Sequence, residues 1–201
     1  VLELGGSDPY LILGDADVEQ AAETCVTSRL INSGQSCIAA KRLIVVEDNY
    51  DAFLDAVVDR MSLKHIGDPF DSSIDIGPMA REDLRDKLHE QVQNSIDAGA
   101  ECVLGGDVPA REGFYYPATV LTNVSEGMPA YEEELFGPVA SIIKVADEQE
   151  AIEVANDTDY GLGAAVFSAD EERAEKIAAN ELEAGCCFIN EFVKSDPRLP
   201  F

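Results

Sequence analysis

The segment with the clearest chemical potential is Asn32-Ser33-Gly34-Gln35-Ser36-Cys37-Ile38, which places a cysteine directly after a glycine-containing turn. Glycine has no Cβ, so a turn of this kind lets backbone N–H groups approach a ligand. Such donors favour the thiolate, which is the reactive form of cysteine, and hold the oxyanion that forms when a thiolate attacks a carbonyl group. The residues alone leave a second interpretation open, because a free cysteine is more often a small buried hydrophobic residue.

Three other polar positions stand where an apolar segment meets a turn. Glu3 precedes the turn Gly5-Gly6, and taken alone it is a strand-end carboxylate that faces water. Glu134 precedes Phe136, and the same reasoning makes the pair an acidic helix cap before a core aromatic residue. Asn190 follows an apolar pair and fits a satisfied polar group at a strand end. None of the three identifies a chemical reaction by itself.

Two of these segments together resemble a known pair of motifs. Glu3-Leu4-Gly5-Gly6-Ser7-Asp8-Pro9 and Gly34-Gln35-Ser36-Cys37 are similar to the paired signature of the aldehyde dehydrogenase superfamily, with the cysteine 34 positions after the glutamate. A third segment, Glu134-Leu135-Phe136-Gly137-Pro138-Val139, resembles the E-[IL]-F-G-P-V motif of the same family. Further matches follow the family's order along the whole chain, at residues 67–69, 76–78, 116–121, 155–156, 160–162 and 188–190. Residues 79–81, 83–86 and 194–198 resemble its succinate-semialdehyde dehydrogenases.

The resemblance implies roles for the two paired motifs. Cys37 would be the nucleophile that adds to an aldehyde, and its backbone N–H would be one donor to the resulting alkoxide. Glu3 would be the general base that activates water to hydrolyse the thioester. A coenzyme A-acylating relative, in which coenzyme A resolves the thioester, is an alternative that Glu3 disfavours. A non-catalytic scaffold or binding protein of the same fold is another alternative, which the intact Cys37 and Glu3 disfavour.

The resemblance also implies cofactor and substrate contacts. Glu134 would accept hydrogen bonds from the nicotinamide ribose of NAD or NADP, Phe136 would pack beside the nicotinamide ring, and Gly5 would serve a turn on the cofactor side. Asn190 and Arg198 are the candidate substrate residues. Arg198, with Lys194, would attract the carboxylate of a substrate such as succinate semialdehyde, although solvated loop cations explain both equally well. Cys186 and Cys187 would line the substrate entrance, as buried thiols or as a redox pair.

Apolar and amphipathic segments alternate along the chain, which predicts strands separated by helices. Strands are predicted over 1–4, 10–13, 43–46, 101–104, 116–121, 139–145, 163–167 and 186–189, and helices over 15–31, 50–63, 81–98, 148–155 and 170–180. Strands joined by helices need crossover connections, so the sheet should be mostly parallel. We expect an α/β domain of three layers, with helices on both faces of the sheet, of the aldehyde dehydrogenase catalytic-domain type.

The family resemblance also sets an expectation for the extent of the chain. Members of the family carry an N-terminal nucleotide-binding domain and a C-terminal tail used in assembly, and neither has a match within residues 1–201. We therefore expect a catalytic-domain fragment that binds NAD(P) poorly and turns over little by itself. Its parent is expected to be a homo-oligomer, a dimer or a tetramer.

The charge of the chain restricts its partners. Forty acidic residues against 14 basic ones give a net charge of −26, which argues against a nucleic-acid partner and against docking on an anionic membrane. The acidity is spread along the chain, and we expect an origin in a salt-rich cytoplasm, where salt screens self-repulsion. Five irregularly spaced cysteines predict reduced cytoplasmic thiols. We expect no metal site, since there is neither a CxxC pair nor an HExxH helix, and we see no signal peptide or spanning segment.

Overall fold

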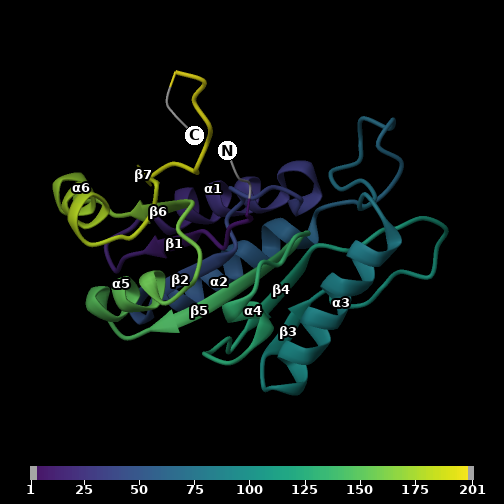
Figure 1. Cartoon of the computed structure of the whole chain (residues 1–201), viewed down its shortest axis with the longest axis horizontal. Helices are drawn as coiled ribbons and strands as arrows, with labels where there is room; N and C mark the ends of the chain where they lie inside the picture. Colours follow the sequence, from purple (N-terminus) through teal and green to yellow (C-terminus); the bar gives the residue numbers. More distant parts are fainter. Residues whose placement is uncertain (1–3, 199–201) are drawn as a thin grey trace.

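The computed structural model describes residues 4–198, and within them seven strands form one sheet in the order β3-β4-β5-β2-β1-β6-β7 (Figure 1). Neighbouring strands are parallel except β3 and β4, which are antiparallel. The strands are β1 (Pro9–Ile12), β2 (Arg42–Val46), β3 (Glu101–Leu104), β4 (Thr119–Thr122), β5 (Val139–Val145), β6 (Gly163–Phe167) and β7 (Cys186–Ile189). The predicted mostly parallel sheet is therefore confirmed.

Helices cover both faces of the sheet, which gives the expected three layers (Figure 1). Helices α1 and α2 pack against one face, and α3, α4, α5 and α6 contribute to the core on the other. The helices are α1 (Val18–Leu30), α2 (Glu47–Ser62), α3 (Glu82–Asp97), α4 (Pro129–Glu132), α5 (Glu148–Asn156) and α6 (Glu171–Asn180), and a 3₁₀ helix η1 spans Ile31–Gly34.

Strand β1 shows why both faces need a cover. Tyr10 and Ile12 join the core beneath α1 and α2, whereas Leu11 and Leu13 join the core on the other face. Side chains alternate between the faces of a strand, so a continuous apolar segment must be buried on both sides. The parallel β1–β2 register aligns Pro9 with Arg42, which brings the loops before these strands to the same edge of the sheet.

Three details differ from the sequence-based expectations. The strand predicted over 1–4 falls mainly outside the described residues, and Leu4 is not in a strand. Strand β4 begins at Thr119 rather than at residue 116, because Pro117 has no N–H to donate to a neighbouring strand. The short helix α4, which begins at Pro129, was not expected from periodicity because it is a single turn.

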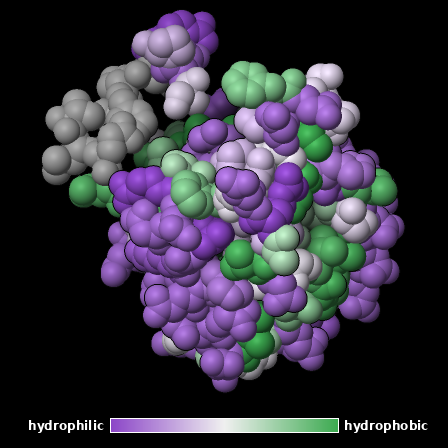
Figure 2. All heavy atoms as spheres, turned by 90° about the vertical axis from the view of Figure 1, so that its right-hand side faces the viewer, coloured by the Kyte–Doolittle hydropathy of each residue, from purple (hydrophilic) through white to green (hydrophobic). Residues whose placement is uncertain are grey.

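Figure 2 shows one face of the molecular surface by residue hydropathy. On the face seen from the side of α3, hydrophilic residues cover most of the area and apolar residues show between them (Figure 2). The most exposed large apolar residue between residues 4 and 198 is Phe70, which is 98% exposed in the loop between α2 and α3. Among the described residues, no helix has the length and apolar content that crossing a bilayer would require.

Candidate active site

The Cys37 loop is built from consecutive residues in a left-handed conformation. Asn32, Ser33 and Gly34 have φ angles of 52°, 56° and 76°. A Cβ at Gly34 would lie 2.1 Å from the carbonyl oxygen of Gly137, so this glycine is required for close packing as well as for its φ angle. The Asn32 side chain supports the turn by donating to the Gln35 carbonyl (2.9 Å). The loop thus meets the segment before β5 through backbone alone.

Two buried cations hold the inner side of this loop. Arg29, at the end of α1, donates to the Gly34 carbonyl (2.6 Å). Lys41 donates from Nζ to the carbonyl oxygens of Ser36 (3.0 Å), Cys37 (2.9 Å) and Ala39 (3.3 Å). Both cations are almost fully buried, whereas Cys37 is a half-buried free thiol. The carbonyl groups of the loop therefore point into the protein, toward positive charge.

Glu134 joins the loops before β1 and β5. Its Oε1 accepts from the Gly6 N–H (3.1 Å) and lies 3.7 Å from Lys41 Nζ. A Cβ at Gly5, where φ is 88°, would come within 2.6 Å of the Glu134 Oε2, so the bare backbone of Gly5 makes room for this carboxylate. A Cβ at Gly6 would meet the Cys37 carbonyl oxygen at the same distance. The three sequence motifs therefore meet where the parallel strands β1, β2 and β5 begin. We call this side of the sheet its amino edge, and the side where these strands end its carboxyl edge.

A cleft of about 320 Å³ opens beside Glu134. Phe136 lines it together with Leu84, Lys87, Leu88, Gln91, Glu133 and Tyr160. The Glu134 side chain is 21% exposed, and no described residue donates a hydrogen bond to its Oε2. A free carboxylate oxygen next to an aromatic wall fits a diol joined to a flat ring, which is the ribose–nicotinamide end of NAD(P).

Asp8 completes the amino-edge cluster, which we define as Asp8, Arg29, Lys41 and Glu134. Its Oδ1 accepts from the Gly163 N–H (3.1 Å), while Oδ2 is buried without a partner among the described residues. Burial raises the pKa of Asp8 to about 7, against the opposing charge of Lys41. Burial, followed by the nearby Arg29, lowers the pKa of Lys41 to about 8. Both charged forms are therefore destabilised in the folded protein.

Glu134 was a candidate from the sequence, whereas the two buried cations of this cluster, Arg29 and Lys41, were not, although a signal existed. Arg29 lies four positions after the apolar Cys25 on the inward side of α1, Lys41 directly precedes the buried strand β2, and Arg42 is its first residue. A charged residue at a position that periodicity assigns to the core must find a partner, so it marks a buried polar site.

The expected site residues are not all brought together. Cys37, Gly5, Glu134 and Phe136 lie at the amino edge. Glu3, the expected base, lies outside the described residues.

Asn190 follows the carboxyl end of β7. Its side chain accepts from the Ser168 N–H and donates to the Ser168 carbonyl, both at 3.0 Å. These bonds match the interpretation of Asn190 as a satisfied polar group at a strand end.

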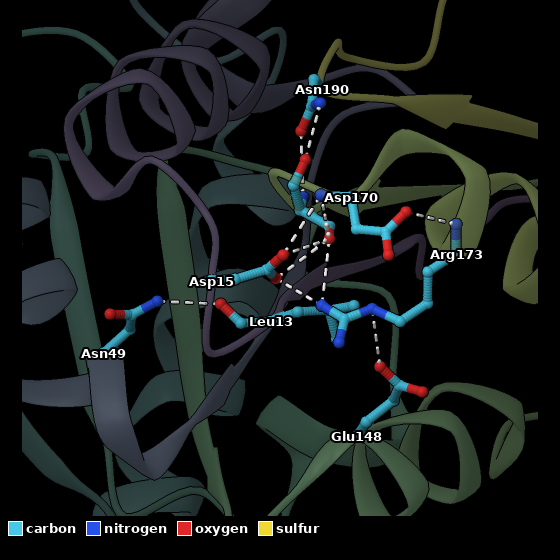
Figure 3. A network of polar contacts seen from close by, with 8 residues as sticks. Leu13, Asp15, Asn49, Glu148, Asp170, Arg173 and Asn190 are labelled. Carbon is cyan, nitrogen blue, oxygen red and sulfur yellow. Dashed lines mark hydrogen bonds and ion pairs between the residues drawn. The ribbon is translucent and has the colours of Figure 1, made fainter.

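Asn190 lies at one end of a second group of polar contacts, which extends past Asp15 to Arg173 and Glu148 (Figure 3). Ser168 Oγ donates to both carboxylate oxygens of Asp15 (2.9 Å), and Arg173 pairs with Asp15 and with Glu148 (3.3 Å). We call Asp15, Glu148, Ser168, Arg173 and Asn190 the carboxyl-edge network. Partial burial raises the pKa of Asp15, but hydrogen bonds from Ser168 and Asp170 and the charge of Arg173 together lower it below its ordinary value.

The remaining candidates lie on the C-terminal segment and on β7. Arg198 is exposed and pairs with Asp196 in the same loop, as a solvated loop cation would. Cys186 and Cys187 are half-buried free thiols at the start of β7. Burial raises the pKa of both, that of Cys187 to about 11, which disfavours their thiolates. Within residues 4–198, no group of three or more His, Cys, Asp or Glu side chains is arranged to bind a metal ion.

Comparison with known proteins decides the family. The family model described as "Aldehyde dehydrogenase family" matches residues 1–201. The chain belongs to the aldehyde dehydrogenase family. This confirms the resemblance carried by the three motifs, and the sheet topology is that of an aldehyde dehydrogenase.

Individual relatives among the aldehyde dehydrogenases agree. The chain is 48% identical over its whole length to a succinate-semialdehyde dehydrogenase [NADP(+)] of Mycobacterium ulcerans and to the succinate semialdehyde dehydrogenase [NAD(P)+] Sad of Escherichia coli, covering 44% and 43% of them. It aligns over its full length with the crystal structure of a Streptococcus pyogenes succinic semialdehyde dehydrogenase in complex with NADP+, with a TM-score of 0.95 and 40% identity, covering 44% of that chain. The chain thus spans less than half the length of these relatives.

Proposed function

We propose that the protein containing this chain oxidises an aldehyde to a carboxylate with NAD or NADP, and that Cys37 is its nucleophile. The observation that carries the proposal is the convergence of three loops at the amino edge. Gly34 packs on Gly137, Gly6 packs on the Cys37 carbonyl, and the Gly6 N–H binds Glu134. The link from the half-buried Cys37 through Lys41 to Glu134, which lines the cleft together with Phe136, supports a nicotinamide-binding role for that cleft.

The chemistry assigned to this chain begins and ends at Cys37. Its thiolate forms a C–S bond with the aldehyde carbon, and the carbonyl oxygen becomes an alkoxide that the Cys37 backbone N–H holds. When the alkoxide re-forms its C=O bond, the former aldehyde carbon loses its hydrogen as hydride, which leaves an acyl-Cys37 thioester. NAD or NADP, with its ribose on Glu134 and its ring against Phe136, would supply the hydride acceptor. Glu3 then takes a proton from water as that water attacks the acyl-Cys37 thioester, which releases the carboxylate and restores the thiol.

A short semialdehyde, with succinate semialdehyde first, is the proposed substrate. The names of the M. ulcerans and E. coli relatives, at 48% identity, support this choice. Arg198 stays a candidate for the substrate carboxylate, although its pairing with Asp196 gives it another role. We also propose a homo-oligomeric parent and an origin in a salt-rich cytoplasm, the latter supported by the net charge of −26.

Selective labelling of Cys37 tests the nucleophile. Iodoacetamide at neutral pH should modify Cys37 ahead of Cys25, Cys102, Cys186 and Cys187, as followed by mass spectrometry of peptides. Uniform or absent labelling would favour the scaffold alternative.

In the whole protein, Cys37→Ser should lower aldehyde-dependent NAD(P)H formation by at least about 10³-fold, because the hydroxyl is a far weaker nucleophile. The matched control Cys102→Ser replaces a half-buried thiol on β3 and should keep the rate. Glu3→Gln should leave a burst of about one equivalent of NAD(P)H followed by slow turnover, since only the hydrolysis step loses its base. Coenzyme A would then be added to the Glu3→Gln variant. If it raises the turnover of the variant to that of the unmodified enzyme in water, the acyl-transferring alternative is favoured.

A further inference from the structure

The buried ammonium group of Lys41 lies directly behind the residue that would do the chemistry. It donates to three carbonyl groups of one loop, those of Ser36, Cys37 and Ala39, and it is 2% exposed. A buried lysine is costly, because burial removes the hydration of its charge. An apolar residue at this position would avoid that cost, so the hydrogen bonds that Lys41 makes need an explanation.

The Ser36 carbonyl provides that explanation. A peptide unit is planar and trans, so the C=O of one residue and the N–H of the next point in opposite directions. Lys41 holds the Ser36 carbonyl oxygen on the inner side at 3.0 Å, and the Cys37 N–H must therefore point away from Lys41, toward the outer side. No acceptor among the described residues bonds this N–H. It is free to donate to a ligand.

We propose that Lys41 is a positioning residue, which aims the Cys37 N–H at the developing oxyanion by holding the Ser36 and Cys37 carbonyls on the opposite side. The inference rests on the proposed role of Cys37 as the nucleophile. Lys41 touches neither substrate nor cofactor in this account. Its Nζ lies 3.7 Å from the Glu134 Oε1, which fixes the ammonium group between the nucleophile loop and the wall of the cleft.

Protonation of Lys41 is part of the device. The ammonium form has three N–H donors for three carbonyls, whereas the neutral amine has two. The charged and titratable groups that face it are Asp8 from the loop before β1, Glu134 from the loop before β5, Arg29 from α1 and the Cys37 thiol of its own loop. Loss of the proton should loosen one carbonyl and let the peptide before Cys37 rotate.

Two probes that react with the Cys37 thiolate separate the orientation of the Cys37 N–H from the reactivity of the sulfur. In the reaction with p-nitrophenyl acetate, a C–S bond forms, the carbonyl oxygen becomes an oxyanion, and the C–O bond to p-nitrophenolate then breaks. Iodoacetamide alkylates sulfur by displacing iodide, with no oxyanion. The ratio of the acylation rate to the alkylation rate at Cys37 therefore cancels the thiolate fraction and reports the oxyanion donor alone. Both rates are measured on the whole protein without a cofactor.

Lys41→Met should lower this ratio about tenfold, a part of the roughly 10²–10³-fold that loss of a whole oxyanion donor costs. Lys41→Arg should restore most of it, because the cation is kept. Lys64→Met, which removes a surface lysine paired with Asp75, should leave it unchanged. An unchanged ratio in a folded Lys41→Met chain would overturn the proposal.

The unmodified chain gives a second test that does not depend on folding of a variant. The ratio should fall as the pH rises past the pKa of Lys41, which burial lowers to about 8. A ratio that stays constant through this range contradicts the positioning role. If neither probe modifies Cys37 ahead of the other thiols, the proposed nucleophile itself is wrong, so the two failures are distinguishable.

Discussion

The sheet carries one polar cluster at its amino edge and another at its carboxyl edge, and the two differ in the burial and the pKa values of their charged groups. The amino-edge cluster buries Asp8, Arg29 and Lys41 almost completely, leaves polar atoms without partners among the described residues, and moves the pKa values of Asp8 and Lys41 toward neutrality. In the carboxyl-edge network, Asp15 and Arg173 are each more than one-third exposed, and Asp15 is stabilised as a carboxylate. Stability alone would favour the second arrangement, so the first is expected where function requires strained or buried charge.

The largest effect should come from filling the close contact at the amino edge. Gly34→Ala must accommodate a methyl group 2.1 Å from the Gly137 carbonyl oxygen at a φ of 76°, and we expect it to lower the free energy of unfolding by about 4 kcal/mol. Gly127→Ala is the matched control, because its φ is 86° with no atom within 4 Å, and strain alone should cost it about 1 kcal/mol. Urea denaturation measures both. Equal losses would show that the contact is not tight.

The next effect sets the two aspartates against each other. Asp8 has a pKa raised from 3.8 to about 7, so its contribution to stability is full below its unfolded pKa and is lost as the pH rises toward 7. Asp8→Asn should remove this loss, so the variant gains on the unmodified chain by about 3 kcal/mol between pH 4 and pH 7.

Asp15 should show the opposite slope. Its pKa is lowered in the folded protein, so its contribution is present above the unfolded pKa and is lost as the pH falls through the folded pKa. Asp15→Asn should therefore lose ground to the unmodified chain as the pH rises through the acidic range. Unfolding free energies measured across pH for both variants check this, and slopes of the same sign would remove the contrast between the two edges.

The smallest effect belongs to the carboxyl edge. Ser168→Ala removes the hydroxyl that donates to Asp15, and we expect a loss of about 1 kcal/mol, the usual net value of a hydrogen bond to a partly exposed group. Ser62→Ala, which removes an exposed bond to the Asp59 carbonyl, should cost less. Labelling of Cys37 by iodoacetamide should be unchanged in both variants. A slower reaction in Ser168→Ala would mean that the two edges are coupled.

Most helices, strands and motif loops could be predicted from the sequence. Most of the buried charged residues around those loops could not. Strands β2, β5, β6 and β7 and helices α1, α2, α3, α5 and α6 follow from local periodicity, because each buries a face set by neighbours within a few positions. The glycine-containing turn predicted before Cys37 is present as η1 (Ile31–Gly34).

The contacts that build the amino-edge cluster join distant parts of the chain. Gly6 binds Glu134 across 128 positions, and Gly163 binds Asp8 across 155. No local pattern reports such pairs, since only the order of the strands in the sheet brings them together. Asn190 illustrates the converse, because its motif suggested a substrate contact while its partner, Ser168, lies on the neighbouring strand connection.

The backbone contact between Gly34 and Gly137 has a mechanical consequence. No side chain lies between the two chains at this point, and a well-packed interior yields little to compression. A ligand bound in the cleft could displace residues 134–138 by a few tenths of an ångström. Because the two backbones are in direct contact, we expect the loop that carries Cys37 to move with them. Related proteins are therefore expected to vary in the side chains that line the cleft and to keep glycine at positions 34 and 137.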